Sequence, residues 1–297
     1  MNTFLETRGY GSDFPVSAFY SNDVNFLAHW HIDVEMVLVC EGSIRIGVNK
    51  EAKVLGAGEM AVCGSTDIHY YDSKERHSTV ILLQFRPELV GSPGGWPEDF
   101  SFDPAFIDLQ RAEPSIRRAI REIFRDLAAE MQETTPSSYF YKNGRIISVP
   151  NQSNEKKPFY QLYVKGKIHE LCALLLRHFP TSPAASRKKN NKLPDIQKIQ
   201  CAIEYMAQNY ARDISLSEIA AVSNFSPYHF SRLFHQFTGI PFHQYLSRIR
   251  IAQAEQLIKA NQKPMIEIAF DCGFNSVRTF NRTFKAVKGF PPSRGKE

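Results

Sequence analysis

The sequence of 297 residues lacks long hydrophobic runs, and none approaches the roughly 20 apolar residues that a helix needs to cross a bilayer. Its start, MNTFLETRGYGSDF, also lacks the basic residues and the apolar core of a secretory signal peptide. These two absences argue against a membrane-spanning helix and predict a cytoplasmic protein.

Cysteine is scarce as well, because the chain has five, an odd number, and none stands in a C-x-x-C pair. This scatter argues against a disulfide framework and against a cysteine-based zinc site. We expect the thiols to lie buried in the core. They are Cys40, Cys63, Cys172, Cys201 and Cys272.

The apolar content of 43% is that of an ordinary globular protein, and the length suffices for two domains. Charge is divided unevenly. Residues 181–297 hold 17 lysines and arginines against 8 aspartates and glutamates, a net charge of +9, whereas the rest of the chain carries −4. Scattered basic residues often form only a solvated face. In a segment that also carries the motifs described next, they favour a phosphate-binding surface.

The segment Ile214–Pro241 has the pattern of two helices joined by a tight turn. Ser215 followed three residues later by Glu218 is typical of a capping box, and Ser226 marks the start of a second helix. Between them stands Asn224, a residue type that tolerates the left-handed backbone of such a turn. The pattern predicts a helix-turn-helix whose second helix enters a DNA major groove.

The chain repeats this unit. Glu267–Ala269 copies Glu218–Ala220 at an offset of 49 residues, and Gly273 stands where Asn224 stood, so both turns carry a residue that accepts positive φ. One supersecondary unit used twice implies one mode of action used twice. Beyond the turn the offset becomes 50, and the matched pairs are Phe230 and Phe280, Arg232 and Arg282, Phe234 and Phe284, Gly239 and Gly289, and Pro241 and Pro291.

From about Ile196 to the C-terminus the sequence resembles the AraC/XylS family of bacterial transcription regulators. The motif from Ile266 to Gly289, with its I-E-I-A, G-F, T-F-x-R-T-F-K and G elements, is similar to the second-repeat signature of that family. The resemblance implies binding to double-stranded operator DNA, a small-molecule effector such as a sugar, a homodimer and contact with RNA polymerase. The family's base-contacting positions fall on Tyr228, His229, Ser231, Arg232, Val277, Arg278, Asn281 and Arg282.

The residue types at these positions suit DNA. Arginine bonds guanine bidentately and asparagine bonds adenine, so the second helix is better equipped for direct readout; the alternative for each arginine is a phosphate contact. The segment Phe242–Ala260 between the repeats predicts one helix of ~18 residues and ~27 Å. That length is suited to holding two recognition helices about one DNA turn, ~34 Å, apart.

The N-terminal half has β-strand character in Val34–Cys40, Ser43–Val48, Glu59–Cys63 and Thr79–Phe85. In Ser43–Val48 the apolar residues alternate, which places them on one face. The strands are separated by short breaks, which suggests a small antiparallel barrel. The breaks are Glu41 with Gly42, Val48 with Asn49, and Gly56 to Gly58.

Within this half, His29, His31, Glu35 and the later His69 have the spacing of metal ligands and resemble the two motifs of the cupin barrel. Three imidazoles and one carboxylate suit a divalent transition metal. The alternative, which we favour, is a set of polar groups in a pocket or satisfied core histidines, with no cofactor. With Trp30 these four residues form the candidate ligand-binding set. Nearby aromatic residues either line a pocket or fill the core: Phe19, Tyr20, Trp30, Tyr70 and Tyr71.

Two amphipathic helices are predicted after the barrel, at Pro114–Glu133 and Tyr160–Phe179. Their apolar faces either pack on the barrel or form the dimer interface that the family resemblance favours. The segment Thr134–Lys157 between them is expected to be a loop with a short strand at Arg145–Val149. Pro180–Pro194 has the composition of a linker.

The predicted fold class is therefore α+β and multidomain. Residues 1–180 form a cupin-like β-barrel with a helical dimerisation segment, 181–194 a linker, and 195–297 an all-α domain with two helix-turn-helix units. The predicted function is ligand-responsive, sequence-specific transcription regulation without enzymatic activity. The alternative is a metal-dependent cupin enzyme, an oxygenase or isomerase that uses the His/Glu set, with an appended DNA-binding domain. The repeat favours the regulator, because an enzyme has no use for a second helix-turn-helix.

Overall fold

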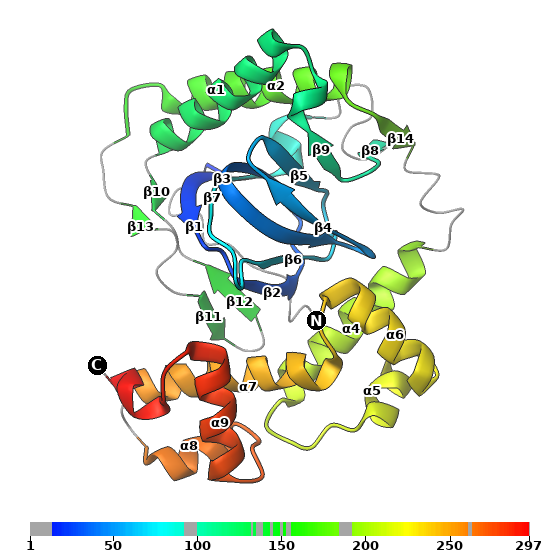
Figure 1. Ribbon diagram of the computed structural model, residues 1–297, viewed down its shortest axis with the longest axis vertical. Coiled ribbons are helices and arrows are strands. Elements are labelled where there is room, and N and C mark those ends of the chain that lie inside the picture. The colour runs from blue at the N-terminus through cyan, green and yellow to red at the C-terminus, as the bar shows by residue number, and fades with distance from the viewer. Residues whose placement is uncertain are drawn as a thin grey trace. The chain divides into compact units, whose positions relative to one another are not determined.

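The computed structural model describes residues 14–91, 100–131, 133–134, 139–142, 145–148, 151–152, 156–183, 192–260 and 263–296. Contacts divide the chain into two compact units (Figure 1). One is built mainly from residues up to Ile196 and holds the large β-sheet, and the other is built mainly from Gln197–Glu297 and is helical. None of the described helices combines the length and the apolar character that crossing a membrane requires.

The first unit is a mainly antiparallel β structure organised by one long strand. Strand β3 (Val34–Val48) pairs along its first half with β7 and β5, and along its second half with β4 and β6. The other main strands are β1 (Val16–Asn22), β2 (Phe26–His29), β4 (Glu51–Gly56), β5 (Glu59–Cys63), β6 (His69–Asp72), β7 (Ser78–Phe85), β8 (Phe100–Phe102) and β9 (Phe106–Asp108).

The strand order along the sheet is β13-β10-β1-β7-β3-β5-β9, where β10 is Glu133–Thr134 and β13 is Asn151–Gln152, and β2 joins through β6. This arrangement confirms a cupin-like β domain. Among the described strands, however, no pairing joins β9 back to β13, so the predicted barrel is open rather than closed.

The sequence prediction was wrong about one break. Glu41 and Gly42 do not separate two strands but form an irregularity inside β3, where the register to β7 shifts between Val39 and Glu41. Gly42 has φ +68°, and a Cβ at this position would lie 1.9 Å from the carbonyl oxygen of His77. Glycine is required here by the close approach of β7 as well as by the backbone angle.

The other two predicted breaks are turns. Asn49, at φ 54°, follows β3, and Gly58, at φ 88°, precedes β5. Alternation along the second half of β3 also holds, because Ile44, Ile46 and Val48 are all buried in one cluster of core residues.

The predicted helices form as α1 (Pro114–Met131) and α2 (Tyr160–His178), which lie side by side along the sheet (Figure 1). Glu133, predicted as the end of the first helix, belongs instead to β10 (Glu133–Thr134). The apolar faces of both helices join a core cluster with β1, β3 and β7, so packing on the sheet is confirmed for them. Their buried members include Ile120, Ile123, Phe124, Leu127, Val164, Ile168, Leu171 and Leu175.

Short strands occur where the sequence predicted irregular chain. The expected strand near Arg145 is β12 (Arg145–Ser148), and it pairs with β11 (Tyr139–Lys142); β13 (Asn151–Gln152) pairs with β10. The start of the predicted linker is also ordered, as β14 (Thr181–Pro183) on β8. Residues 184–191 of that linker lie outside the described part of the chain.

The second unit contains the two predicted helix-turn-helix motifs. Asn224 (φ 53°) and Gly273 (φ 81°) turn the chain between the two helices of each motif. The recognition helices are capped at their starts by Ser226 and Ser276, which accept hydrogen bonds from the third residue that follows. The helices are α4 (Lys192–Asn209), α5 (Leu216–Val222), α6 (Pro227–Thr238), α7 (Phe242–Ala260), α8 (Met265–Asp271) and α9 (Val277–Lys288), followed by a 3₁₀ turn at Pro292–Lys296.

The cysteines agree with the prediction in part. All five are free thiols, and Cys63, Cys172 and Cys272 are buried. Cys40 is half-buried, and Cys201 on α4 is exposed, so the prediction of a core thiol was wrong for Cys201.

Substitution can separate the two reasons for glycine at position 42, which are its positive φ and the close approach of the His77 carbonyl. Gly42→Ala should destabilise the first unit by more than the ~1–3 kcal/mol of an unfavourable backbone angle alone, because the new methyl group meets the carbonyl of His77. Gly91→Ala is the matched control, since Gly91 has φ +65° but open space around its Cβ position. Tryptophan fluorescence reports on this half of the chain, because both tryptophans, Trp30 and Trp96, stand in it. Equal thermal midpoints for the two variants would contradict the role of close packing.

Candidate functional site

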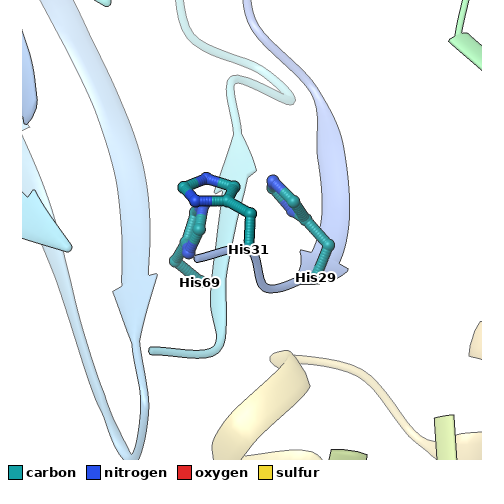
Figure 2. Close-up of side chains that lie close together, drawn as sticks. All are labelled: His29, His31 and His69. Carbon is teal, nitrogen blue, oxygen red and sulfur yellow. The ribbon is translucent and has the colours of Figure 1, made fainter. Parts of the chain in front are cut away.

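A buried cluster of three histidines and one glutamate lies inside the first unit. His29 ends β2 and pairs in register with His69 at the start of β6; His31 follows β2, and Glu35 stands on β3. Each side chain is 2% exposed or less. Figure 2 shows the three imidazoles facing one another, with ring centroids 4.2 Å apart for His29 and His69 and 4.8 Å for His31 and His69. The structure thus brings together the four residues that the sequence proposed.

Backbone carbonyls hold each imidazole in one orientation. The Nδ1 atoms of His29, His31 and His69 each lie 2.9 Å from the carbonyl oxygen of a residue two positions away. A carbonyl oxygen only accepts, so Nδ1 carries the proton in every case. Each ring therefore offers Nε2 to the cluster, as in histidines whose other nitrogen is held for metal ligation.

Glu35 is held by two donors that the sequence analysis did not assign. Tyr71 donates its hydroxyl proton to one carboxylate oxygen, and Gln84 donates an amide proton to the other. The same Gln84 nitrogen lies 3.2 Å from Nε2 of His31. Gln84 faces Glu35 across the β3–β7 pairing. Its signal in the sequence is a lone polar residue at the end of the apolar run of β7.

Electrostatics keep Glu35 ionised. Burial raises the pKa of its carboxyl group, but the interactions with His31, whose Nε2 lies 3.2 Å from the carboxylate, and with His69 and His29 outweigh burial and leave the pKa below its ordinary value. Burial and the charge of Glu35 raise the pKa of Tyr71 well above its ordinary value, so its hydroxyl stays protonated and donates.

The cluster contains more acceptors than donors. Nε2 of His69 has no hydrogen-bond partner among the described residues, and the same holds for Oε1 of Gln84. Burial, together with the neighbouring His29, lowers the pKa of His69 to about 3, so this imidazole is neutral and its Nε2 presents a lone pair. Buried acceptors without donors are costly. A proton-donating ligand or a cation would satisfy them.

The residues fit a divalent transition metal. Ligating atoms of the three histidines lie within 4.8 Å of one another, and Glu35 Oε1 lies 3.8 Å from Nε2 of His69. Nitrogen and oxygen donors in this number suit zinc, manganese, iron, cobalt or nickel. The carbonyls that hold Nδ1 supply the outer shell that such sites need, which the sequence alone did not reveal.

The aromatic residues divide between core and surface. Phe19 and Tyr71 belong to one core cluster, and Trp30 and Tyr70 are also buried. Tyr20 is 46% exposed and does not line the interior.

A second candidate site lies on recognition helices α6 and α9. The predicted base-contacting residues that are exposed are Tyr228, Ser231, Arg232, Arg278, Asn281 and Arg282, all in the first two turns of these helices. Tyr228 is 82% exposed, an unusual position for a large ring. His229 and Val277 are half-buried, and His229 packs edge-on against Phe225 with ring centroids 5.0 Å apart.

The opposite face of each recognition helix forms the core. Phe230, Phe234 and Phe280 are fully buried, as expected for residues without a DNA contact. Two arginines at equivalent positions of two capped, exposed helices define a DNA-binding protein of the double helix-turn-helix class, preceded by a β domain with an interior polar cluster.

Comparison with known families agrees with this architecture. Residues 15–146 match the AraC-like ligand binding domain, and residues 219–297 match a helix-turn-helix domain. The chain belongs to the AraC family of transcriptional regulators.

Curated relatives match part of the chain. The probable transcriptional regulator LumQ of Photobacterium leiognathi is 37% identical over 90 residues, 30% of this chain and 36% of that protein. The bifunctional transcriptional activator/DNA repair enzyme AdaA of Bacillus subtilis is 29% identical over 105 residues, 35% of this chain and 50% of that one. The chain thus spans about a third to a half of the length of these relatives.

Among solved structures, the C-terminal domain of the response regulator AraT from Geobacillus stearothermophilus is 29% identical. It covers 33% of this chain and 83% of its own, with a TM-score of 0.32.

The fit to a metal can be tested with cobalt(II) and the full chain. We expect the wild-type protein to bind about one ion, with visible absorption typical of nitrogen ligation, and to unfold at a higher temperature as a result. His31→Ala should abolish both effects. His77→Ala is the matched control, because His77 is 98% exposed and pairs with Asp23 on the surface. Unchanged cobalt binding by His31→Ala would show that the ion binds elsewhere.

Proposed function

We propose that this protein is a transcription regulator that binds operator DNA through its C-terminal region and responds to a small molecule bound in its N-terminal region. Residues 1–180 would sense the ligand, 181–194 would link, and 195–297 would bind DNA. The observation that carries the proposal is the repeated unit, in which two recognition helices with equivalent caps expose equivalent arginines in the positive part of the chain.

DNA recognition follows from these two helices. Arg232 and Arg282 are the principal readers, with support from Arg278 and Asn281 on the second helix. The remaining predicted positions, Tyr228, His229, Ser231 and Val277, flank them. Helix α7, which joins the two helix-turn-helix motifs, has 19 residues and therefore a length of ~28 Å, compatible with two major grooves on one side of a duplex.

Ligand sensing is assigned to the interior cluster, with Trp30 beside His29, His31, Glu35 and His69. Its unpartnered acceptors favour an occupant that brings protons or positive charge. A sugar hydroxyl supplies the first, and a divalent metal supplies the second. A bound ion would provide a Lewis-acidic centre to which an oxygen atom of the effector binds.

Assembly and location complete the proposal. We assign a homodimer, with α1 and α2 as the helical segment that mediates it, and contact with RNA polymerase at the promoter. The place of action is the cytoplasm, where a bacterial operator lies.

The rival function is a metal-dependent cupin enzyme. A fit to metal does not separate the two, because a sensor and an enzyme both use such ligands. The duplicated DNA-binding unit favours the regulator, since catalysis in the β domain gains nothing from a second recognition helix.

Substitution of the two arginines tests the DNA proposal. If each makes a bidentate contact to guanine, Arg232→Ala and Arg282→Ala should each weaken binding by ~1–3 kcal/mol and relax the preference at one base pair. A phosphate contact would behave differently, because its loss weakens binding to every sequence and lowers the salt dependence. The measurement is binding to all single-base variants of a selected site at two salt concentrations.

Lys285→Ala is a suitable control, since Lys285 lies exposed in the last turn of α9, away from the start of the helix. Wild-type base preferences in both arginine variants would rule out direct readout by these residues.

The interior cluster should control the response to the effector. In a thermal-shift screen of sugars, polyols and divalent ions, the true effector should raise the midpoint of the wild-type chain. His69→Ala should lose that shift and the ligand-dependent change in DNA affinity, yet keep basal DNA binding, because His69 lies in the other unit. A normal response from His69→Ala would place the ligand outside the cluster.

A further inference from the structure

The two helix-turn-helix units meet at one arginine of α7. The guanidinium group of Arg250 donates from Nε to the carbonyl oxygen of Tyr210 at 2.8 Å and from Nη2 to that of Arg212 at 2.9 Å. Both carbonyls lie in the segment that follows the end of α4 at Asn209. A planar guanidinium with fixed donors suits two such acceptors.

The segment Tyr210–Arg212 is itself held by α4 and by α5, the first helix of the first helix-turn-helix motif. The Arg212 side chain forms an ion pair with Glu218 in the first turn of α5 at 2.6 Å, and its guanidinium lies 5.4 Å from the ring of Tyr205 on α4. Tyr205 also donates its hydroxyl to Glu218. The carbonyls that Arg250 binds therefore move with α4 and α5.

The turn of the second helix-turn-helix motif packs against the same segment, Tyr210–Arg212. The Arg250 guanidinium lies 5.9 Å from the ring of Phe274, the residue after the turn glycine Gly273. A Cβ at Gly273 would lie 2.6 Å from the carbonyl oxygen of Tyr210 and 2.7 Å from that of Ala211. Only glycine permits this approach of two backbones.

This contact explains one difference between the two turns of the repeat, the change from Asn224 to Gly273. Both turns need positive φ. In the first helix-turn-helix motif Asn224 adopts this angle, and its side chain is exposed. Positive φ alone would allow asparagine in the second turn too. Gly273 differs because the carbonyls of Tyr210 and Ala211 occupy the space where a side chain would begin.

We infer that Arg250 and Gly273 form a clasp that fixes the orientation of the second recognition helix relative to the first, and so sets the number of base pairs between the two halves of the DNA site. Both are positioning residues and touch no base. The inference rests on the proposed DNA-binding function. It predicts that DNA is bound at one spacing, because a rigid pair of helices matches one separation of major grooves.

The test begins with a duplex selected from random sequence by the full wild-type chain. Each half of that site is then tested alone, and the spacer between the halves is changed by one base pair in either direction. We expect at least a tenfold loss of wild-type affinity at the altered spacings. If selection enriches no sequence, the proposed function fails, which is a result distinct from failure of the clasp.

Two matched pairs of variants isolate the contact. Arg250→Met removes the carbonyl bonds, and Arg248→Met is its control at an exposed position of the same helix. Gly273→Ala introduces the clash, and Gly289→Ala is its control, because Gly289 has φ +83° against +81° and open space around its Cβ position. Backbone strain is thus equal in the second pair, and only the contact differs.

We expect Arg250→Met and Gly273→Ala to bind single half-sites within about twofold of wild type, but to distinguish the spacings by less than about threefold. The controls should behave as wild type.

Arg250→Lys keeps the charge but cannot bond both carbonyls in one plane. Its preference for the selected spacing should lie between those of the wild type and Arg250→Met. If Arg250→Met fails to fold, the Gly273→Ala and Gly289→Ala pair decides. Wild-type spacing preference in folded Gly273→Ala, or loss of half-site binding equal to its loss at the full site, would overturn the inference.

Discussion

The ionised carboxylate of Glu35 is the constraint around which the β domain is arranged. An unpaired charge in a protein interior is unfavourable by several kcal/mol, so its neighbours must supply hydrogen bonds. Strand β3 places Glu35 opposite Gln84 on β7, and β6, which pairs with the far half of β3, brings Tyr71 to the other oxygen. The two donors stand on strands that are distant from Glu35 in the sequence, and strand pairing in the open sheet brings them to its carboxylate.

The same cluster shows why its occupant matters. Glu35 has its donors, but Nε2 of His69 and Oε1 of Gln84 do not. The set of side chains is therefore complete only when something else joins it. A ligand that donates a proton or carries positive charge would satisfy these two acceptors.

The helical half was predictable because its signals are local. Caps three residues apart, turn residues with positive φ and the apolar period of Phe242–Ala260 act within one or two helical turns, and each was found as expected. The strands β10, β11 and β14 were missed because two to four residues carry too little pattern, and their pairing depends on distant partners. Gly42 was misinterpreted as a turn for the same reason, since His77, on which its role depends, is 35 positions away in the sequence.

The histidine cluster was predictable from the sequence only in part. Residue types and spacing sufficed to group His29, His31, Glu35 and His69, but the atoms that orient the rings are backbone carbonyls, which have no sequence signature. Gln84 was missed because a single polar residue in an apolar strand has several explanations.

The duplication has a consequence for how such a protein would leave DNA. When one helix-turn-helix motif is bound, the 19 residues of α7 keep the other motif close to the duplex. Its effective concentration there is of the order of millimolar, even if each motif alone binds weakly. Release then requires both motifs to detach before either rebinds, so the residence time depends on two modest contacts rather than on one strong contact. A base change in one half of the operator would shorten the stay of the protein without ending it, which gives such operators a graded series of strengths.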